Sequence, residues 1–475
     1  MSDSNILSAA IDAFKQTFTK MCSDLPNTLD TLDEKSFKMM TEVLLNAAGN
    51  AGIAGLETFL AESDTVHATI TKNGSVYRYK GKCSKELLTL FGTINVERTM
   101  YYDEVNGGQY YYPIDAALGL EKDDFATLET REMLLFAASS SVPSEVEQLL
   151  KKCSLCQPSR TAIQNIINRD GQLMESLRDK IAQNVFDHYQ PPKETKALVA
   201  SLDGVNVLLR EKGKKKGRKN KRPQDSIQTD LASTSYHNAM VGSVSLYGVD
   251  AQGKPERLSS VYTARMPEEK SIEFKKEFER MVKTVESKFS GDTSPVYRVL
   301  LTDGHLMIKG YAKESAFLQQ YEKCLDFYHA TEHLSKAADA MYGEKTDFSK
   351  AYYAKWRSRL LSVSNAPDAI VRSLVSFQQR TPLTGKRKDE LKTEVTFFKK
   401  NKKLMKYYNF NKRGLPIGSG PIEAAAKTIV RQRMCRSGMS WSRVKGQYVL
   451  TVRSYVKSGL WDEAWEYYVE LKKAA

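Results

Sequence analysis

Long apolar stretches are missing from this chain of 475 residues. No run of about 18 apolar residues occurs, so the sequence predicts no transmembrane helix. The N-terminus also lacks the apolar core of a secretory signal, because Asp12 and Lys15 interrupt it. Together these absences predict a soluble, cytoplasmic protein that has no membrane partner.

Cysteine is scarce, with six residues at scattered positions. This number predicts free thiols in a reducing compartment and excludes a disulfide scaffold. Cys153 and Cys156 form a lone CxxC, but a zinc site would need two more ligands of similar spacing, and none lies nearby. We therefore interpret the two as incidental helix cysteines.

Acidic residues are too few to balance the basic ones, 57 against 71, which gives a net charge of +14. The excess predicts a polyanionic partner, most simply nucleic acid, although charge that only keeps the protein soluble is the alternative. Two runs, 211–222 and 399–413, concentrate the basic residues and favour contact with phosphates. The first run supplies five candidate DNA contacts: Lys214, Lys215, Lys216, Arg218 and Lys219.

Changes in residue pattern divide the chain into six regions, which indicate an α+β multidomain protein. They are 1–65 (helices), 66–126 (small and β-rich), 127–190 (helical), 191–333 (a mixed sheet with the basic insert 211–222), 334–411 (helical) and 412–475 (a glycine turn and helices). Asn73-Gly74 predicts a hairpin turn in the second region. The tyrosine-rich stretch 105–115 receives no assignment.

Residues 143–170 show a helix, a short turn and a second helix that starts near a cap at Ser159. This order is compatible with a helix-turn-helix, and a plain helical hairpin is equally compatible. In the first case the second helix presents four polar side chains to DNA: Arg160, Thr161, Gln164 and Asn165.

Two aspartates belong to apolar strands, and each precedes a glycine. Asp303 ends the strand "VYRVLLT", so a turn could explain it, whereas "VNVLL" continues the strand beyond Asp203. Acids at neighbouring strand positions repel each other and favour a divalent cation between them. A two-metal phosphoryl-transfer site commonly needs a third acid.

Glu423 is the candidate for this third acid. It stands in "GSGPIEAAAK", where Gly418 and Gly420 predict a turn and Pro421 suits a first helical position. A structural role at the helix start explains why a glutamate is tolerated there. It does not explain the glycines and alanines, which would let the helix lie close against the sheet.

The segments "SLDG", "LLTDG", "DFYHATEHL" and "IGSGPIEAAAKTIVRQRMCRSGMSWS" resemble the DDE transposases of bacterial insertion sequences, particularly the ISKra-type group. The resemblance runs from about residue 90 to about residue 456. It does not cover the first 65 residues. It implies an RNase H-like mixed-sheet catalytic core and an all-helical insertion at 334–411. The residue patterns before the core predict an N-terminal DNA-binding region of helices and strands.

The resemblance also implies roles for individual residues. Asp203, Asp303 and Glu423 would be the catalytic acids and metal ligands. Asp326 and His329 match a D-x-x-H signature and would support the site, although a packed histidine is the alternative. The remaining implied DNA contacts are Lys427, Arg431, Arg433, Arg436 and Trp441, with a solvated basic face and core packing of the tryptophan as alternatives.

The implied activity is hydrolysis of a phosphodiester at the end of the element, after which the freed 3′-OH attacks target DNA. The implied cofactor is Mg²⁺, with two ions expected and Mn²⁺ able to substitute. The implied partners are the terminal inverted repeats, target DNA and further copies of the chain, on the nucleoid.

Two other interpretations stay open at this point. One is a catalytically inactive or domesticated DNA-binding descendant, which would usually lose one of the acids. The other is a different RNase H-like nuclease, which the order Asp, Asp, late Glu disfavours.

Overall fold

The computed structural model describes residues 3–23, 33–72, 74–103, 108–210, 236–289, 296–304 and 306–474. The chain separates into two compact units: Met1–Met174 with Trp465–Ala475, and Glu175–Ala464. The six regions predicted from the sequence are finer than these units, and their boundaries stay predictions. None of the described helices is long and apolar enough to cross a membrane.

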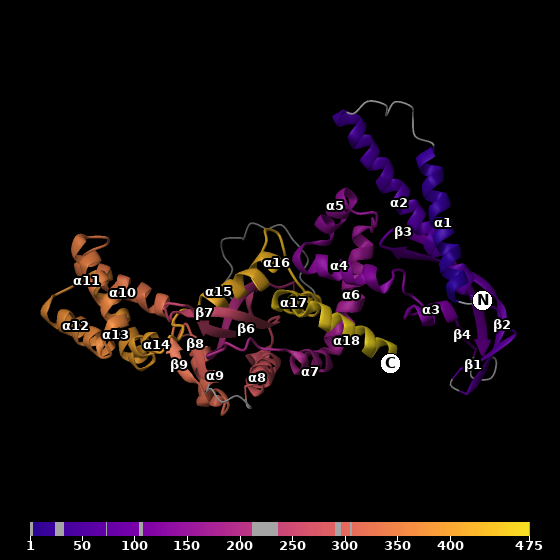
Figure 1. Cartoon of the computed structure of the whole chain (residues 1–475). Coiled ribbons are helices and arrows are strands. Elements are labelled where there is room, and N and C mark those ends of the chain that lie inside the picture. The colour runs from indigo at the N-terminus through magenta and orange to yellow at the C-terminus, as the bar shows by residue number, and fades with distance from the viewer. Residues whose placement is uncertain are drawn as a thin grey trace, which may run out of the picture. The chain divides into compact units, whose positions relative to one another are not determined.

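The first unit begins with two long helices, as the sequence predicts. α1 spans Asp3–Ser23, α2 spans Glu34–Ser63, and they pack side by side (Figure 1). Asp33 caps α2, because its carboxylate accepts a hydrogen bond from the Ser36 N–H at 2.7 Å.

Four antiparallel strands follow, in the order β1-β2-β3-β4. Their bounds are Thr69–Lys72 (β1), Ser75–Thr89 (β2), Gly92–Asp103 (β3) and Gln109–Tyr111 (β4). Gly74 has a φ of 81°, the left-handed conformation that the predicted hairpin turn requires. The tyrosine-rich stretch, unassigned from the sequence, thus supplies a short edge strand. Leu87, Ile94 and Val96 form the apolar core of the sheet with Leu60 of α2.

Helices complete the first unit. They are α3 (Pro113–Ala117), α4 (Leu128–Ser140), α5 (Pro143–Cys153), α6 (Arg160–Ser176) and most of α18 (Trp461–Ala474). Arg131 of α4 donates to the buried carboxylate of Asp170 on α6 at 3.0 Å, and the Tyr468 hydroxyl of α18 donates to it at 2.6 Å. These contacts join the three helices. The predicted helices in 127–175 are confirmed.

A five-stranded mixed sheet forms the centre of the second unit, which confirms the α+β class and the mixed sheet predicted from the sequence. Its strands are β5 (Ala197–Leu208), β6 (Tyr236–Val249), β7 (Pro255–Arg265), β8 (Tyr297–Thr302) and β9 (Glu322–Leu325), in the order β7-β6-β5-β8-β9. β5, β6 and β7 pair antiparallel, whereas β8 and β9 run parallel to β5.

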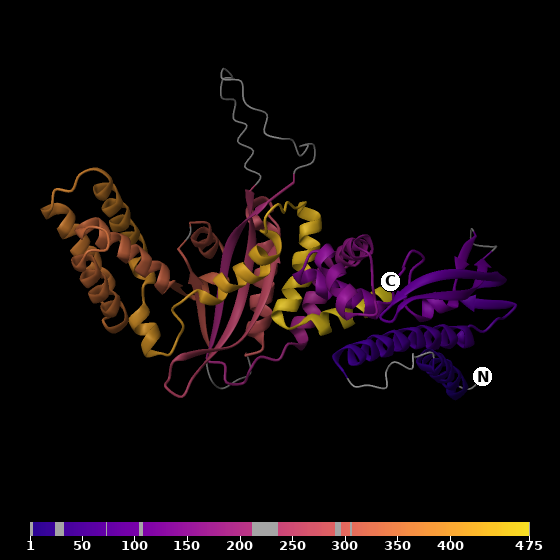
Figure 2. The ribbon, with the colours of Figure 1, turned by 90° about the horizontal axis from the view of Figure 1, so that it is seen from above.

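A helical region lies between β9 and the last part of this unit in the sequence, and Figure 2 shows its helices gathered in one bundle beside the sheet. They are α10 (Phe327–Tyr342), α11 (Asp347–Ser362), α12 (Ala366–Arg380), α13 (Gly385–Asn401) and α14 (Tyr407–Lys412). Buried side chains such as Leu334, Ile370 and Phe398 form its core. The helices predicted for this region are confirmed.

One boundary predicted in this region is wrong. The segment "KCLDFYH" predicts a short strand that ends near His329, but β9 stops at Leu325. Asp326 then caps α10, because its carboxylate accepts the backbone N–H of His329 at 2.5 Å. His329 therefore lies in the first turn of a helix.

The remaining elements of the second unit are short, apart from three helices. The α-helices are α7 (Arg178–His188), α8 (Ile272–Ser287), α9 (Leu306–Glu314), α15 (Gly420–Ala425), α16 (Gln432–Met434) and α17 (Arg443–Ser458). The described part of this unit also contains three 3₁₀ turns, η2 (Glu269–Ser271), η3 (Leu318–Gln320) and η4 (Lys402–Leu404), and one π-helical segment, η5 (Ala426–Arg431).

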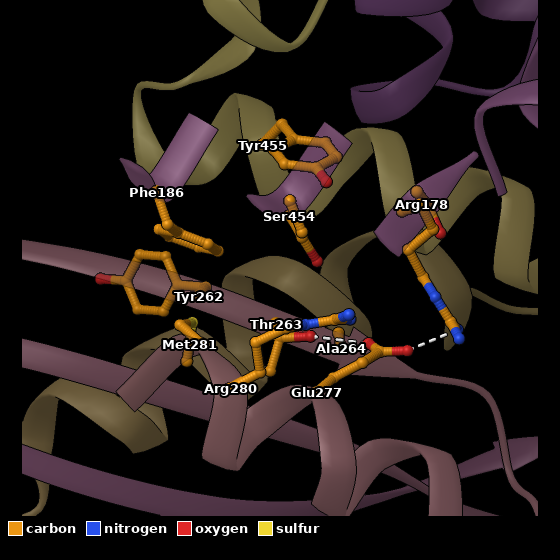
Figure 3. Close-up of a pocket in the computed structure, with 12 residues that line it drawn as sticks. Arg178, Phe186, Tyr262, Thr263, Ala264, Glu277, Arg280, Met281, Ser454 and Tyr455 are labelled. Atoms are coloured by element: carbon orange, nitrogen blue, oxygen red, sulfur yellow. Dashed lines mark hydrogen bonds and ion pairs between the residues drawn. The ribbon is translucent and has the colours of Figure 1, made fainter. Parts of the chain in front are cut away.

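Buried charges join α7, α8 and β7 (Figure 3). Glu277 of α8 accepts a hydrogen bond from Thr263 at 3.1 Å and pairs with Arg178. The Arg265 Nη1 lies 3.1 Å from the same carboxylate. Burial raises the pKa of Glu277 to about 8, although Arg178 opposes the rise.

Replacing Glu277 by Gln is expected to flatten the pH dependence of stability between the ordinary pKa of 4.5 and the folded-state pKa of about 8. In this window folded Glu277 keeps a proton that the unfolded chain has released, so raising the pH lowers the free energy of unfolding. The effect is at most about 5 kcal/mol. Urea unfolding across the window measures it, with Glu273→Gln on the same helix, 43% exposed, as the control. A parental pH slope in the Glu277→Gln chain would refute the assignment.

Candidate functional site

Asp203 lies inside β5, on the face of the sheet opposite α8. Its neighbour Leu202 pairs with Gly242, and a Cβ at Gly242 would collide with Phe278 of α8. Because side chains alternate along a strand, Asp203 points to the other face. The strand continues to Leu208, so Asp203 is not a turn residue.

Asp303 follows β8 directly and stands level with Asp203. Ser201 of β5 pairs with Leu301 of β8 in parallel register, and each acid comes two residues later. Neighbouring strands lie about 4.8 Å apart, so the two acids occupy adjacent positions in and just after the two internal strands β5 and β8. Gly304, with a φ of 85°, then turns the chain into the loop before α9.

Glu423 lies in the first turn of α15, which packs against β5 and β6. The predicted helix start is confirmed, with Pro421 in the first turn. Ala425 and Ala426 are buried, but Ala424 is exposed, because three successive residues of a helix cannot all face the sheet. Glu423 is itself exposed, so its carboxylate is open to solvent.

The charges of Asp303 and Glu423 both act on Asp203. Burial raises the pKa of Asp203, and the charges of Asp303 and Glu423 raise it further. The Gly204 N–H and the charge of Arg431 oppose this shift. The fold therefore brings together three carboxylates that are far apart in the sequence, with one arginine beside them.

The acids do not form a ready metal site. Within the described residues, no group of three or more His, Cys, Asp or Glu side chains is arranged to hold a metal ion. Asp203 instead accepts the Gly204 N–H at 2.7 Å, and Glu423 accepts the Ser419 hydroxyl at 2.7 Å. Carboxylates of this kind suit Mg²⁺, and a cation would relieve the charge repulsion that raises the pKa of Asp203.

Asp326 ties the start of the Glu423 helix to the end of the sheet. Its carboxylate, fully buried, accepts the backbone N–H of Ser419, the residue whose hydroxyl bonds Glu423. The Phe327 N–H also donates to the carbonyl of Ile417 at 2.9 Å. Asp326 thus holds the turn that leads into α15, a contact that the sequence did not predict.

Gly418 is needed in this turn for lack of space. A Cβ at Gly418 would approach a ring carbon of Tyr328 to 2.8 Å, which is closer than real Cβ contacts. Because Tyr328 is 60% exposed, a larger residue would displace either that ring or the turn. The glycine that the sequence marks as a turn former therefore acts here through close packing.

His329 points toward the helical region. Its ring lies 4.9 Å from the ring of His333 and 5.9 Å from that of Phe397 on α13, measured between centroids. This placement gives its predicted role beside the acids no support.

A π-helical segment follows Glu423 directly, at Ala426–Arg431. Such segments leave carbonyl groups without their usual helical donors. The buried Arg453 of α17 donates from Nε to the carbonyls of Thr428 at 3.0 Å and Ile429 at 2.9 Å. No pattern in the sequence marks Arg453 for this supporting role.

The predicted phosphate contacts around α15 occupy different environments. Lys427, Arg431 and Arg436 are exposed. Arg433 is only 2% exposed, and its guanidinium lies 5.0 Å from the centroid of the Trp441 ring. This burial does not support the DNA contact predicted for Arg433. Trp441 is half-buried, and its Nε1 donates to the Met434 carbonyl at 3.0 Å, as expected for packing.

The second DNA-binding candidate lies on α6 of the first unit. The Ser159 hydroxyl accepts the Ala162 N–H at 3.1 Å, which confirms the predicted cap. Arg160, Thr161, Gln164 and Asn165 share one face and line a hollow with the start of α5. This face is available for contact, as a helix-turn-helix requires.

The basic insert lies outside the described residues, which resume at Tyr236. The five candidate contacts predicted there, from Lys214 to Lys219, therefore stay predictions. Cys153, exposed, ends α5, but Cys156, buried, lies in the loop after it, so the prediction of two helix cysteines is wrong for Cys156.

Comparison with known proteins finds a match to one family model and a likeness to solved structures. Residues 33–219 match an uncharacterised protein family, UPF0236. No curated protein matches the chain. Among solved structures, the chain is similar to the Drosophila P element transposase strand transfer complex, at 12% sequence identity and a TM-score of 0.25, over 72% of this chain and 81% of that one. This sequence identity and this TM-score are too low to indicate a function.

Proposed function

We propose that this protein is a DDE transposase of a bacterial insertion sequence, of the ISKra-type group, which cuts DNA at the ends of its element and joins them to target DNA. The observation that carries the proposal is the position of the acids. Asp203 and Asp303 stand level on adjacent parallel strands, and Glu423 enters from a helix packed on the same sheet.

The topology of the second unit supports an RNase H-like core. Such a core would have its first acid on the first strand, its second acid after the fourth strand and its glutamate on a late helix. β5 and β8 are the first and fourth strands of this sheet, and α15 follows the helical region α10–α14. The latter region would then be an insertion into the core.

In this proposal Asp203, Asp303 and Glu423 hold two Mg²⁺ ions, or Mn²⁺ in their place. When bound, the ions would stabilise the attacking and leaving oxygens of an in-line phosphoryl displacement. Asp203 is fixed by a central strand, and Asp326 fixes the turn that carries Glu423. Arg431, whose charge already favours the ionised form of Asp203, would face the phosphate of the cut strand.

The proposed substrate is duplex DNA that carries the terminal inverted repeats of the element. The exposed Lys427 and Arg436 extend the basic surface beyond Glu423, where they would position the DNA backbone. Assembly of further copies on the nucleoid is part of the proposal. Mg²⁺-dependent nicking at the repeats by the purified chain is the experiment that tests it.

Replacing Arg160 and Gln164 by Ala is expected to reduce the preference for terminal repeats over random duplex by about tenfold or more, because side chains on a recognition helix read base edges. Competition anisotropy with the full chain measures this ratio. The control is Lys151→Ala on α5, whose side chain is 55% exposed and which should weaken binding to both duplexes alike. An unchanged ratio in the double variant would place terminal recognition elsewhere.

A further inference from the structure

The sheet of the first unit carries a row of polar aromatic and basic side chains at the end away from its apolar core. Arg78 of β2 pairs with Tyr102 of β3, and Tyr102 pairs with Tyr110 of β4, so the three side chains share one face. Lys80 completes this row, because the bulge between Tyr79 and Gly81 places its ammonium group 5.5 Å from the centroid of the Tyr102 ring.

One aromatic ring of this row, Tyr110, is open to solvent, and Tyr102 beside it is half-buried. Tyr110 is 56% exposed, and its ring centroid lies 4.9 Å from that of Tyr102. The apolar core of the unit is formed elsewhere, around Leu87 and Ile94. Cross-strand pairing explains why the two rings touch, but it does not explain why about half of the Tyr110 surface stays exposed to solvent.

Basic residues dominate this part of the chain, although Lys82 and Lys85 pair with Asp64 and Asp115. The segment 69–85, which contains the β1–β2 hairpin, holds five Lys or Arg and no Asp or Glu. On the other face of the same sheet, Lys72 lies 4.1 Å from the centroid of Tyr111. A sheet end that places an exposed and a half-buried aromatic ring beside cations has the two features that bind single-stranded nucleic acid: stacking platforms and phosphate contacts.

We propose that Arg78, Lys80, Tyr102 and Tyr110, the tyrosine row, bind a DNA strand with unpaired bases. Tyr102 and Tyr110 stack on bases, whose faces are accessible only when they are unpaired, and Arg78 and Lys80 contact the adjoining phosphates. A strand released at a cut element end has this chemistry. The inference rests on the proposed function in one respect, which is that DNA is the partner.

The test compares binding of the full chain to a labelled single-stranded oligonucleotide and to a duplex of the same sequence, by anisotropy without divalent metal. Replacing Tyr102 and Tyr110 together by Leu is expected to weaken single-strand binding about tenfold or more, whereas Phe at both positions keeps the rings and stays close to the parent. Ala at Arg78 and Lys80 is expected to reduce the salt slope by about 0.7 per cation. The matched control is Tyr297→Leu, which removes a ring of similar exposure that also lies beside an arginine, Arg413.

Two results would overturn the inference. One is parental single-strand affinity in the double Leu variant, with circular dichroism showing that it is folded. The other is an equal loss on the duplex, which would mean that the row binds paired DNA. Because no cleavage is required, a tyrosine-dependent affinity can be found even if the chain cuts no DNA, so the inference and the proposed function fail separately.

Discussion

A chain that carries Glu423→Gln is expected to lose Mg²⁺-dependent DNA cleavage by about a thousandfold or more. The amide keeps the shape of the side chain and removes the charge that helps to hold the ions. Loss of several kcal/mol of transition-state stabilisation corresponds to a rate change of this size. Asp203→Asn and Asp303→Asn are expected to behave in the same way. DNA binding should survive in all three, because phosphate contacts come mostly from basic residues.

The matched control for this variant is Glu390→Gln, which changes a half-exposed glutamate in the helical region. It should cut DNA at the parental rate. Glu423 is exposed, so its replacement costs little stability, and a thermal melt can exclude a folding defect. Cleavage by the Glu423→Gln chain at the parental rate would leave Glu423 with a structural role only.

Asp326→Ala is expected to lower the free energy of unfolding by about 3 kcal/mol and to reduce cleavage strongly. The carboxylate is fully buried and accepts the backbone N–H groups of Ser419 and His329, so its removal leaves both donors without an acceptor. The turn that leads to Glu423 would then lose its anchor. Urea unfolding and a nicking assay on the same preparation measure the two effects.

Two further variants separate these effects. Asp326→Asn keeps an acceptor oxygen and should recover part of the lost stability. Ser419→Ala removes only the hydroxyl that bonds Glu423 and should change stability little. Parental stability in the Asp326→Ala chain would show that these hydrogen bonds do not hold the turn.

The positions of the two aspartates could be predicted because their signal is local. An apolar strand that continues past Asp203 excludes a turn at that residue. A strand that stops just before Asp303 places this second acid at the carboxyl end of the strand. The start of α15 was predictable for the same reason, since glycine and proline have strong local preferences. The sequence did not show that Ala424 faces solvent, which depends on where α15 meets the sheet.

The contacts that support the site could not be predicted. Asp326 and Ser419 are far apart in the sequence, and their bond uses a backbone N–H, which every residue except proline has. Arg453 likewise binds two backbone carbonyls that become available only because the helix widens after Glu423. His329 was assigned to a strand end because the cap at Asp326 was not recognised. Arg433 was assigned to DNA by residue type, which does not report burial.

In the proposed function Asp203, Asp303 and Glu423 bind divalent ions as one site. Equilibrium binding of Mn²⁺ to the full chain measures this property without any cleavage step. Electron paramagnetic resonance of free Mn²⁺, with cleavage blocked by a non-scissile DNA end, counts the ions and gives their affinity. Each of the three amide variants is expected to weaken Mn²⁺ binding by about tenfold or more. Parental Mn²⁺ binding in any one of them would contradict it.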